Sequence, residues 1–182
     1  MNSKKYYLTP NEFSVVSAGF GLSMVYGLKQ IDGKVDNKEI CMALHNMYVN
    51  ELIENKNDQG FTTDDEMADM MKRIKSSNRV MVIEFSEEKN VHTICCYCGE
   101  HADKDLIVEE NCSNPDKIIL YFADWDEMQD NILDMTVGKA VTVGILDTKD
   151  GRILEREELD ATLQDFDKKT VLVRYRKEGI QI

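Results

Sequence analysis

The sequence predicts an α+β fold in which N-terminal helices, in the order of a winged helix, pack on a twisted antiparallel β-sheet with a short C-terminal β extension. Apolar residues recur at helical spacing over residues 9–76, and short runs rich in β-branched and aromatic residues follow over residues 79–122. With 182 residues, the chain is long enough to bury a core without disulfides or a metal. We expect residues 1–135 to form the helices and a meander closed by a helix, and residues 136–182 to complete or extend the same sheet in one compact domain.

The first helix has a clear start signal. Thr9, Pro10 and Glu12 form the pattern of a capping box with proline at the first helical position. Behind this start, Phe13 and Val16 are predicted to face inward.

Asp36 is predicted to cap a second, long helix that continues to about Asn55. Its apolar stripe recurs at helical spacing and consists of Ile40, Leu44, Met47, Tyr48 and Leu52.

A third helix begins after a polar break at residues 57–60, with Thr62 or Thr63 as its predicted cap. Acids crowd its first turn and bases its last turn, as the helix dipole favours. Its inward face carries Met67, Met70, Met71 and Ile74.

Strand patterns then follow over residues 79–85, 91–98, 106–109 and 117–122, which predict a four-stranded antiparallel meander. A short helix over residues 124–135 is expected to direct Trp125, Met128 and Ile132 inward. Further strands are expected over residues 140–146, 152–154 and 170–175, with a helical segment over residues 157–166.

The net charge is −12, and it is concentrated in one stretch. Residues 100–134 hold eleven acids against Lys104 and Lys117, so this stretch carries −9. Such a field repels polyphosphates and anionic membranes and attracts basic partners. A solvated face that serves solubility is the alternative interpretation of the same stretch.

The order helix, long helix, helix, hairpin is typical of winged-helix transcriptional regulators, which bind DNA. A DNA-binding face needs net positive charge, because duplex DNA is bound first through its phosphates. Here the expected recognition helix holds four acids against three bases, and the expected wing carries Glu84, Glu87 and Glu88. DNA binding is therefore the less favoured function.

Five cysteines, an odd number, and an N-terminus without an apolar signal-peptide core predict free thiols and a cytoplasmic protein. Cys95, Cys96, Cys98 and Cys112 raise the alternative of a structural zinc site. Because Cys96 and Cys98 are two residues apart in an expected strand, the spacing favours packing over a zinc knuckle. We therefore predict no metal and no cofactor.

We predict that the protein is not an enzyme and has no catalytic residues. None of the common nucleophile, nucleotide-binding or metalloprotease motifs is present. His45, His92 and His101 are the possible bases, and the pattern around His45 and His92 favours a packing or boundary role for both.

Protein binding remains as the predicted activity. Ten methionines supply adaptable apolar surface, although packing is favoured for Met67, Met70 and Met71. The predicted partner-binding residues are the apolar anchors Trp125 and Met128 with the acids Asp124 and Glu127 around them.

Residues 7–13 (Tyr-Leu-Thr-Pro-Asn-Glu-Phe), a helix ending near residues 51–53, the acid-capped helix of residues 65–71 and a strand entered through residues 76–83 resemble the EspG family. EspG proteins are chaperones of type VII (ESX) secretion systems. The resemblance covers roughly residues 6–135 and includes the meander closed by the helix at Trp125. It consists of spacing and residue class.

The resemblance implies a non-catalytic cytosolic chaperone that binds the helical tip of a secreted protein and delivers it for export. Family members build two such halves around a shared sheet, whereas this chain has one half and a shortened β extension. A homodimer would supply the missing half. The family's binding positions lie in the abbreviated part, so no individual binding residue is carried over.

Overall fold

The computed structural model describes residues 4–23, 25, 28, 35–55, 60–87, 90–97, 104–110, 114 and 116–149. Within these ranges, it leaves the side chains of seven residues undescribed: Glu87, Asn90, Trp125, Asp126, Glu127, Gln129 and Leu133. The C-terminal strands and helix predicted beyond residue 149 lie outside the described residues.

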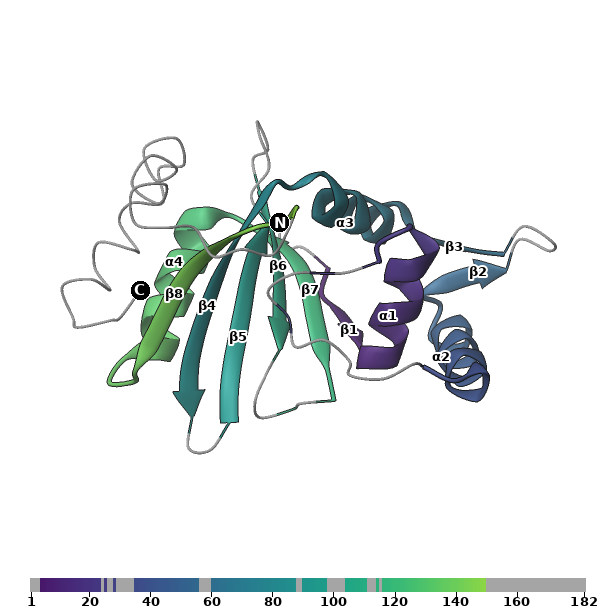
Figure 1. The fold of residues 1–182 in the computed structure, drawn as a ribbon, viewed down its shortest axis with the longest axis horizontal. Coiled ribbons are helices and arrows are strands. Elements are labelled where there is room, and N and C mark those ends of the chain that lie inside the picture. The colour runs from purple at the N-terminus through teal and green to yellow at the C-terminus, as the bar shows by residue number, and fades with distance from the viewer. Residues whose placement is uncertain are drawn as a thin grey trace.

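The described chain forms four helices and two antiparallel sheets, so the predicted α+β class is confirmed. The main sheet has six strands in the order β1-β7-β6-β5-β4-β8. They are β1 (Tyr6–Leu8), β4 (Arg79–Glu87), β5 (Asn90–Tyr97), β6 (Asp105–Glu110), β7 (Ile118–Ala123) and β8 (Val141–Asp147). The predicted meander is thus its centre, β8 extends it beside β4, and the unpredicted β1 extends it beside β7 (Figure 1).

The helices are α1 (Pro10–Gly19), α2 (Asn37–Val49), α3 (Asp65–Ser76) and α4 (Trp125–Thr136). Thr9 and Glu12 form the predicted capping box of α1, and Asp36 caps α2 through a second capping box with Glu39. Both starts follow from side chains that satisfy the free amides of the first helical turn.

The second helix is shorter than predicted, and its end explains why. Asn50 is the C-cap and Glu51 has a φ of 57°, in the left-handed region that usually holds glycine. The amide of Leu52 donates to the carbonyl of Met47 at 2.8 Å, and the amide of Glu51 donates to that of Tyr48 at 3.1 Å. These two bonds form a Schellman motif, which ends the helix at Val49 without the glycine that would have revealed it in the sequence.

Residues after this motif form a small hairpin that the sequence did not reveal. β2 (Ile53–Asn55) pairs with β3 (Phe61–Thr63), so Thr62 and Thr63 belong to a strand and do not cap α3. This hairpin separates α2 from α3, and β4–β5 lies inside a six-stranded sheet, with β8 on one side and β6 on the other. Both features differ from the simple helix-helix-helix-wing order that the sequence predicted.

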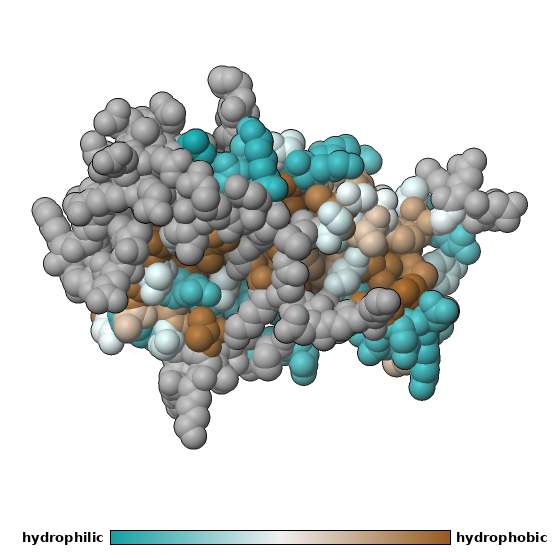
Figure 2. Space-filling view, in the orientation of Figure 1, coloured by the Kyte–Doolittle hydropathy of each residue, from teal (hydrophilic) through white to brown (hydrophobic). Residues whose placement is uncertain are grey.

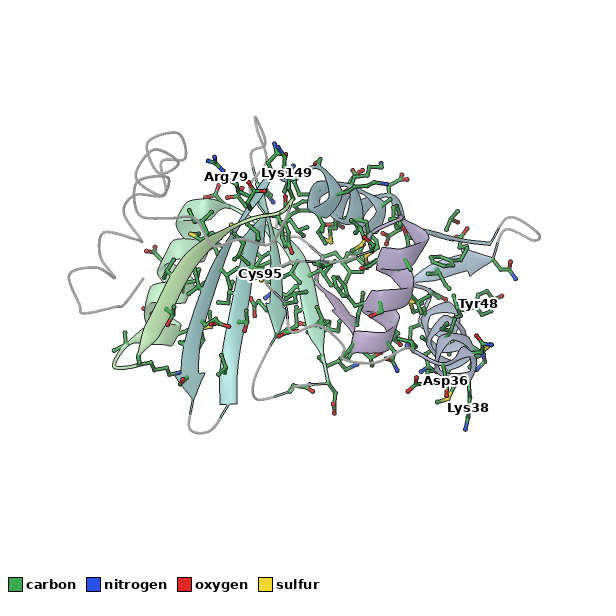
Figure 3. The ribbon with its side chains drawn as sticks, viewed as in Figure 1. Asp36, Lys38, Tyr48, Arg79, Cys95 and Lys149 are labelled. Carbon is green, nitrogen blue, oxygen red and sulfur yellow. The ribbon has the colours of Figure 1, made fainter. Side chains whose placement is uncertain are left out.

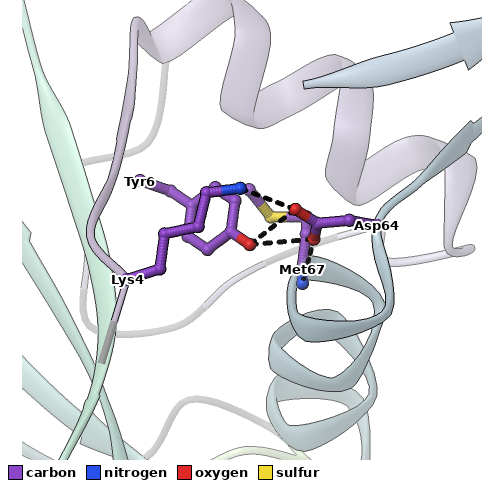
Figure 4. Close-up of polar contacts among 4 residues, drawn as sticks. All are labelled: Lys4, Tyr6, Asp64 and Met67. Atoms are coloured by element: carbon purple, nitrogen blue, oxygen red, sulfur yellow. Dashed lines mark hydrogen bonds and ion pairs between the residues drawn. The ribbon is translucent and has the colours of Figure 1, made fainter. Parts of the chain in front are cut away.

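Asp64 is the N-cap of α3 and also ties this helix to the first strand. Its carboxylate accepts hydrogen bonds from the amide of Met67 at 2.8 Å, the hydroxyl of Tyr6 at 2.7 Å and the amine of Lys4 at 2.8 Å (Figure 4). Burial alone would raise the pKa of Asp64, but these bonds outweigh it and lower the pKa below its usual value. The charged carboxylate therefore stabilises the folded state by joining β1 to α3.

Two hydrophobic cores lie on opposite faces of the main sheet, because alternate residues of each strand point to opposite sides. The first core, here called the N-terminal core, packs α1, α2 and α3 against residues such as Val80, Cys95 and Leu120. The second, here called the α4 core, packs Met128 and Ile132 against the other face. The predicted inward residues Phe13, Val16, Met67, Met70, Met71 and Ile74 all lie in the N-terminal core.

Candidate protein-binding surface

The structure describes the side chains of two of the four predicted partner-binding residues, Met128 on α4 and Asp124 just before it. Met128 is only 3% exposed and belongs to the α4 core, so in this conformation it packs against the sheet and offers no anchor to a partner. Asp124 is exposed, and the side chains of Trp125 and Glu127 lie outside the described residues. The inward position predicted for Met128 from the helical spacing is confirmed.

The acidic stretch is also divided between surface and interior. Asp116, Asp124, Asp130 and Asp134 are exposed, whereas Asp105 and Glu109 are buried. The stretch is therefore not one continuous solvated face.

Glu109 lies in a buried polar cluster on the α4 side of the sheet. Its carboxylate accepts a hydrogen bond from the hydroxyl of Tyr121 and lies 3.7 Å from Nε2 of His92. The His92 ring stacks on Phe85 with 4.6 Å between ring centroids, and the amine of Lys5 lies 4.3 Å from the Tyr121 ring centroid. The sequence predicted that His92 lies in a strand. It could not predict that Glu109 is its neighbour, because this contact depends on the register in which β5 pairs with β6.

The charge state of Glu109 follows from these neighbours. Burial alone would raise its pKa, but His92, the Tyr121 hydroxyl and the positive charge of Lys5 outweigh burial and lower the pKa. Glu109 is therefore a carboxylate at neutral pH. His92 is only 5% exposed and Glu109 only 8%, so the cluster is enclosed within the protein.

The remaining candidates for chemistry are dispersed. Cys95 and Cys96 are buried in different cores on opposite faces of the sheet, as the strand pattern predicted, and burial raises the pKa of Cys95. His45 and Cys41 are exposed on α2. Across the described ranges, no three potential metal ligands come together, while Cys98, His101 and Cys112 fall outside those ranges.

A small pocket of about 90 Å³, partly open to solvent, lies between the end of α3 and the end of β5. Ile74, Lys75 and Tyr97 contribute to its lining. The Lys75 amine already donates to the carbonyl of Phe20 at 3.0 Å. The pocket therefore offers a ligand apolar and polar side chains, and its one amine already has a hydrogen-bond acceptor.

Three of the six exposed large apolar side chains in the described part of the chain lie on α2, and the other three are spread over β1, β5 and the residue after α4. Met42, Tyr48 and Val49 are 55%, 59% and 62% exposed. Tyr48 lies with Asp36 and Lys38 at the end of the molecule farthest from β8 (Figure 3). At this end, formed by α2 and β2, hydrophobic surface lies beside hydrophilic surface (Figure 2).

The opposite side of α2 packs against the N-terminal core. Ala43 and Met47 are buried, and Leu44 packs against the N-terminal core. From Ile40 to Asn50 the helix carries no lysine, arginine, aspartate or glutamate. The helix is therefore anchored on one side and, after Lys38 and Glu39 in its first turn, carries no charged residue on the other, unlike the charged outer surface expected of a helix that only covers a core.

No protein-family model matches the sequence, and no curated protein matches it either. None of the helices in the described part of the chain combines the length and hydropathy that a membrane-spanning helix requires. The function must therefore be argued from the surface itself.

Proposed function

We propose that this protein is a non-catalytic chaperone or adaptor that binds a helical secreted partner of a type VII-like secretion system in the cytoplasm. The observation that carries the proposal is the outward face of α2, where Met42, Tyr48 and Val49 are each more than half exposed. Single exposed apolar residues are ordinary, whereas several on one helix, within a run without charged residues, are typical of a protein interface.

The energetic argument rests on the area that a partner would cover. Fully burying a side chain of this size is worth about 1.5–3 kcal/mol, and these side chains are already partly covered, so each would add on the order of 1 kcal/mol. Methionine and tyrosine are enriched at interfaces because they offer large contact areas with few restrictions on geometry.

The resemblance to EspG chaperones supports the secretion context. The residues that open the resemblance form the capped start of α1, and the resembling meander is followed by α4. The partner class that this resemblance implies, a helical secreted protein, is compatible with a helical surface such as α2.

Co-expression tests the proposal. The tagged protein would be purified together with each small helical protein encoded beside its gene, and complexes would be measured by size-exclusion chromatography with light scattering. We expect one such partner to co-elute at a fixed stoichiometry. If the protein elutes without any of these partners, the proposed function is wrong.

A further inference from the structure

The outward residues of α2 form a stripe along the helix. Lys38, Met42, His45 and Val49 follow one another at intervals of four, three and four residues. This spacing keeps side chains on one side of a helix and is the spacing of a helix–helix packing seam. All four are exposed, with Cys41 beside them.

Charged groups lie at the ends of this stripe, here called the α2 seam. Asp36 and Glu39 are exposed in the capping box at the start of α2, Glu51 is exposed just after its end and Glu54 on β2. Lys38 is the opposing cation among the described residues of α2 and β2, so the local charge is −3. The partial negative charge of the helix C-terminus adds to the charges of Glu51 and Glu54. The end of the seam near Val49 is therefore the more negative one.

We propose that the α2 seam binds one amphipathic helix of a partner protein, which packs apolar residues against Met42 and Val49 and places lysine or arginine side chains beside Glu51 and Glu54. This inference rests on the proposed function, because it names the surface and the partner chemistry of that binding. The seam spacing fits a helix, and the acidic rim selects a basic one.

A second copy of this chain is the less suitable occupant. Two α2 seams brought together would oppose rims of −3 each, within molecules that each carry −12. Such like-charge contacts oppose association, whereas a basic partner gains from the same charges.

Two neutral substitutions test the seam without changing its charge. Met42→Gln and Val49→Gln each replace an apolar side chain with an uncharged polar one, and glutamine is a good helix former. Val137→Gln is the matched control, because Val137 is 77% exposed but lies just after α4. Circular dichroism would show that each variant is folded.

The probe is a synthetic helical peptide of about 21 residues with leucine at the a and d positions of three heptads and lysine on both flanks. A scrambled peptide of the same composition and a peptide with glutamate in place of lysine are its controls. Binding is measured by fluorescence anisotropy at low and physiological salt.

We expect the lysine-flanked peptide to bind, the scrambled and glutamate-flanked peptides to bind at least about tenfold more weakly, and each seam variant to lose about tenfold in affinity, which corresponds to about 1.4 kcal/mol. Val137→Gln should bind as the wild type does. Glu51→Gln with Glu54→Gln should weaken binding mainly at low salt.

The seam is the wrong surface if no peptide binds, if the scrambled peptide binds equally well, or if the seam variants bind as the wild type does. Sedimentation that shows a dimer lost in the seam variants would instead assign the surface to a second copy and overturn the inference. The proposed function is tested separately: a co-expressed helical partner that both the wild type and the Met42→Gln, Val49→Gln double variant retain would support the function and contradict the seam.

Discussion

Two helices of this protein share a methionine-rich composition but differ in what their methionines do. Met67, Met70 and Met71 of α3 are at most 1% exposed, and the exposed positions of that helix hold charged residues such as Asp69 and Lys72. On α2, Met47 is fully buried whereas Met42 is 55% exposed within the run of residues 40–50, which has no lysine, arginine, aspartate or glutamate. The difference lies in the outer face, since both helices bury their inner face.

The comparison shows that methionine content alone does not identify a binding surface. A helix that only covers a core needs a polar outer face, and α3 has one. Exposed apolar residues in a run without charge mark either an interaction site or an aggregation-prone surface. On α2, these residues also have the spacing of a helix–helix packing seam. The two helices should therefore differ in what their methionines contribute to stability and in how accessible they are to a partner.

The largest expected effect is the difference in stability between removing a buried methionine of α3 and removing the exposed methionine of α2. Met70→Ala removes a side chain that is 0% exposed in the N-terminal core, and we expect it to lower the free energy of unfolding by about 2–5 kcal/mol. Met42→Ala removes an exposed side chain and should change it by less than about 0.5 kcal/mol. Urea denaturation measures both, and equal losses would contradict the contrast between the helices.

The cap of α3 gives the next largest effect. Asp64→Ala removes the acceptor for the amide of Met67 and for the hydroxyl of Tyr6, and should cost about 0.5–2 kcal/mol of stability. Asp64→Asn is the matched control, because asparagine also caps helices but carries no charge. If alanine and asparagine destabilise the protein equally, the cap is not what Asp64 contributes.

The pH dependence of the same residue follows from its lowered pKa. The stabilising contribution of charged Asp64 is fully present above the pKa of an unfolded aspartate, about 3.9, and is lost as the pH falls through the lower folded value. The stability difference between wild type and Asp64→Asn should therefore shrink in acid. Unfolding free energies measured from pH 7 to pH 2.5 test this, and a difference that grows in acid would contradict the assigned charge.

The end of α2 gives a smaller effect of opposite sign. Glu51 adopts a φ of 57°, which costs about 1–2 kcal/mol for a residue with a side chain, while glycine adds about 0.5–1 kcal/mol of backbone entropy loss. Glu51→Gly should therefore stabilise the protein by about 0.5–1 kcal/mol. A loss of stability measured by urea denaturation would show that Glu51 is held by contacts that outweigh this strain.

The sequence predicted the parts of the fold that local signals determine. The capped starts of α1 and α2, the inward methionines of α3 and the four central strands all follow from spacing and capping residues close together in the chain. The end of α2 was missed because Glu51 stands at a position where glycine is the usual signal. α1 ends in the same geometry with Gly21.

Features that depend on distant pairing could not be predicted. β1 has three residues and is a strand only because β7 lies beside it, and the His92–Glu109 contact exists only through the register of β5 with β6. For the candidate site, the sequence predicted an apolar anchor at Met128, which the structure buries. The exposed face of α2 was missed because Tyr48 counted as part of the inner stripe.

Cysteine labelling reports on the outer face of α2, because Cys41 is exposed on α2 whereas Cys95 and Cys96 are buried in the sheet. Alkylation by iodoacetamide, resolved for each peptide by mass spectrometry, reports the three thiols in one sample. We expect Cys41 to react much faster than Cys95 and Cys96 in the free protein, and to slow at least about fivefold when the lysine-flanked helical peptide is bound at saturation. A Cys41 that is unreactive in the free protein, or one that reacts at the same rate while the peptide is bound, would contradict the claim that the outer face of α2 is the docking surface.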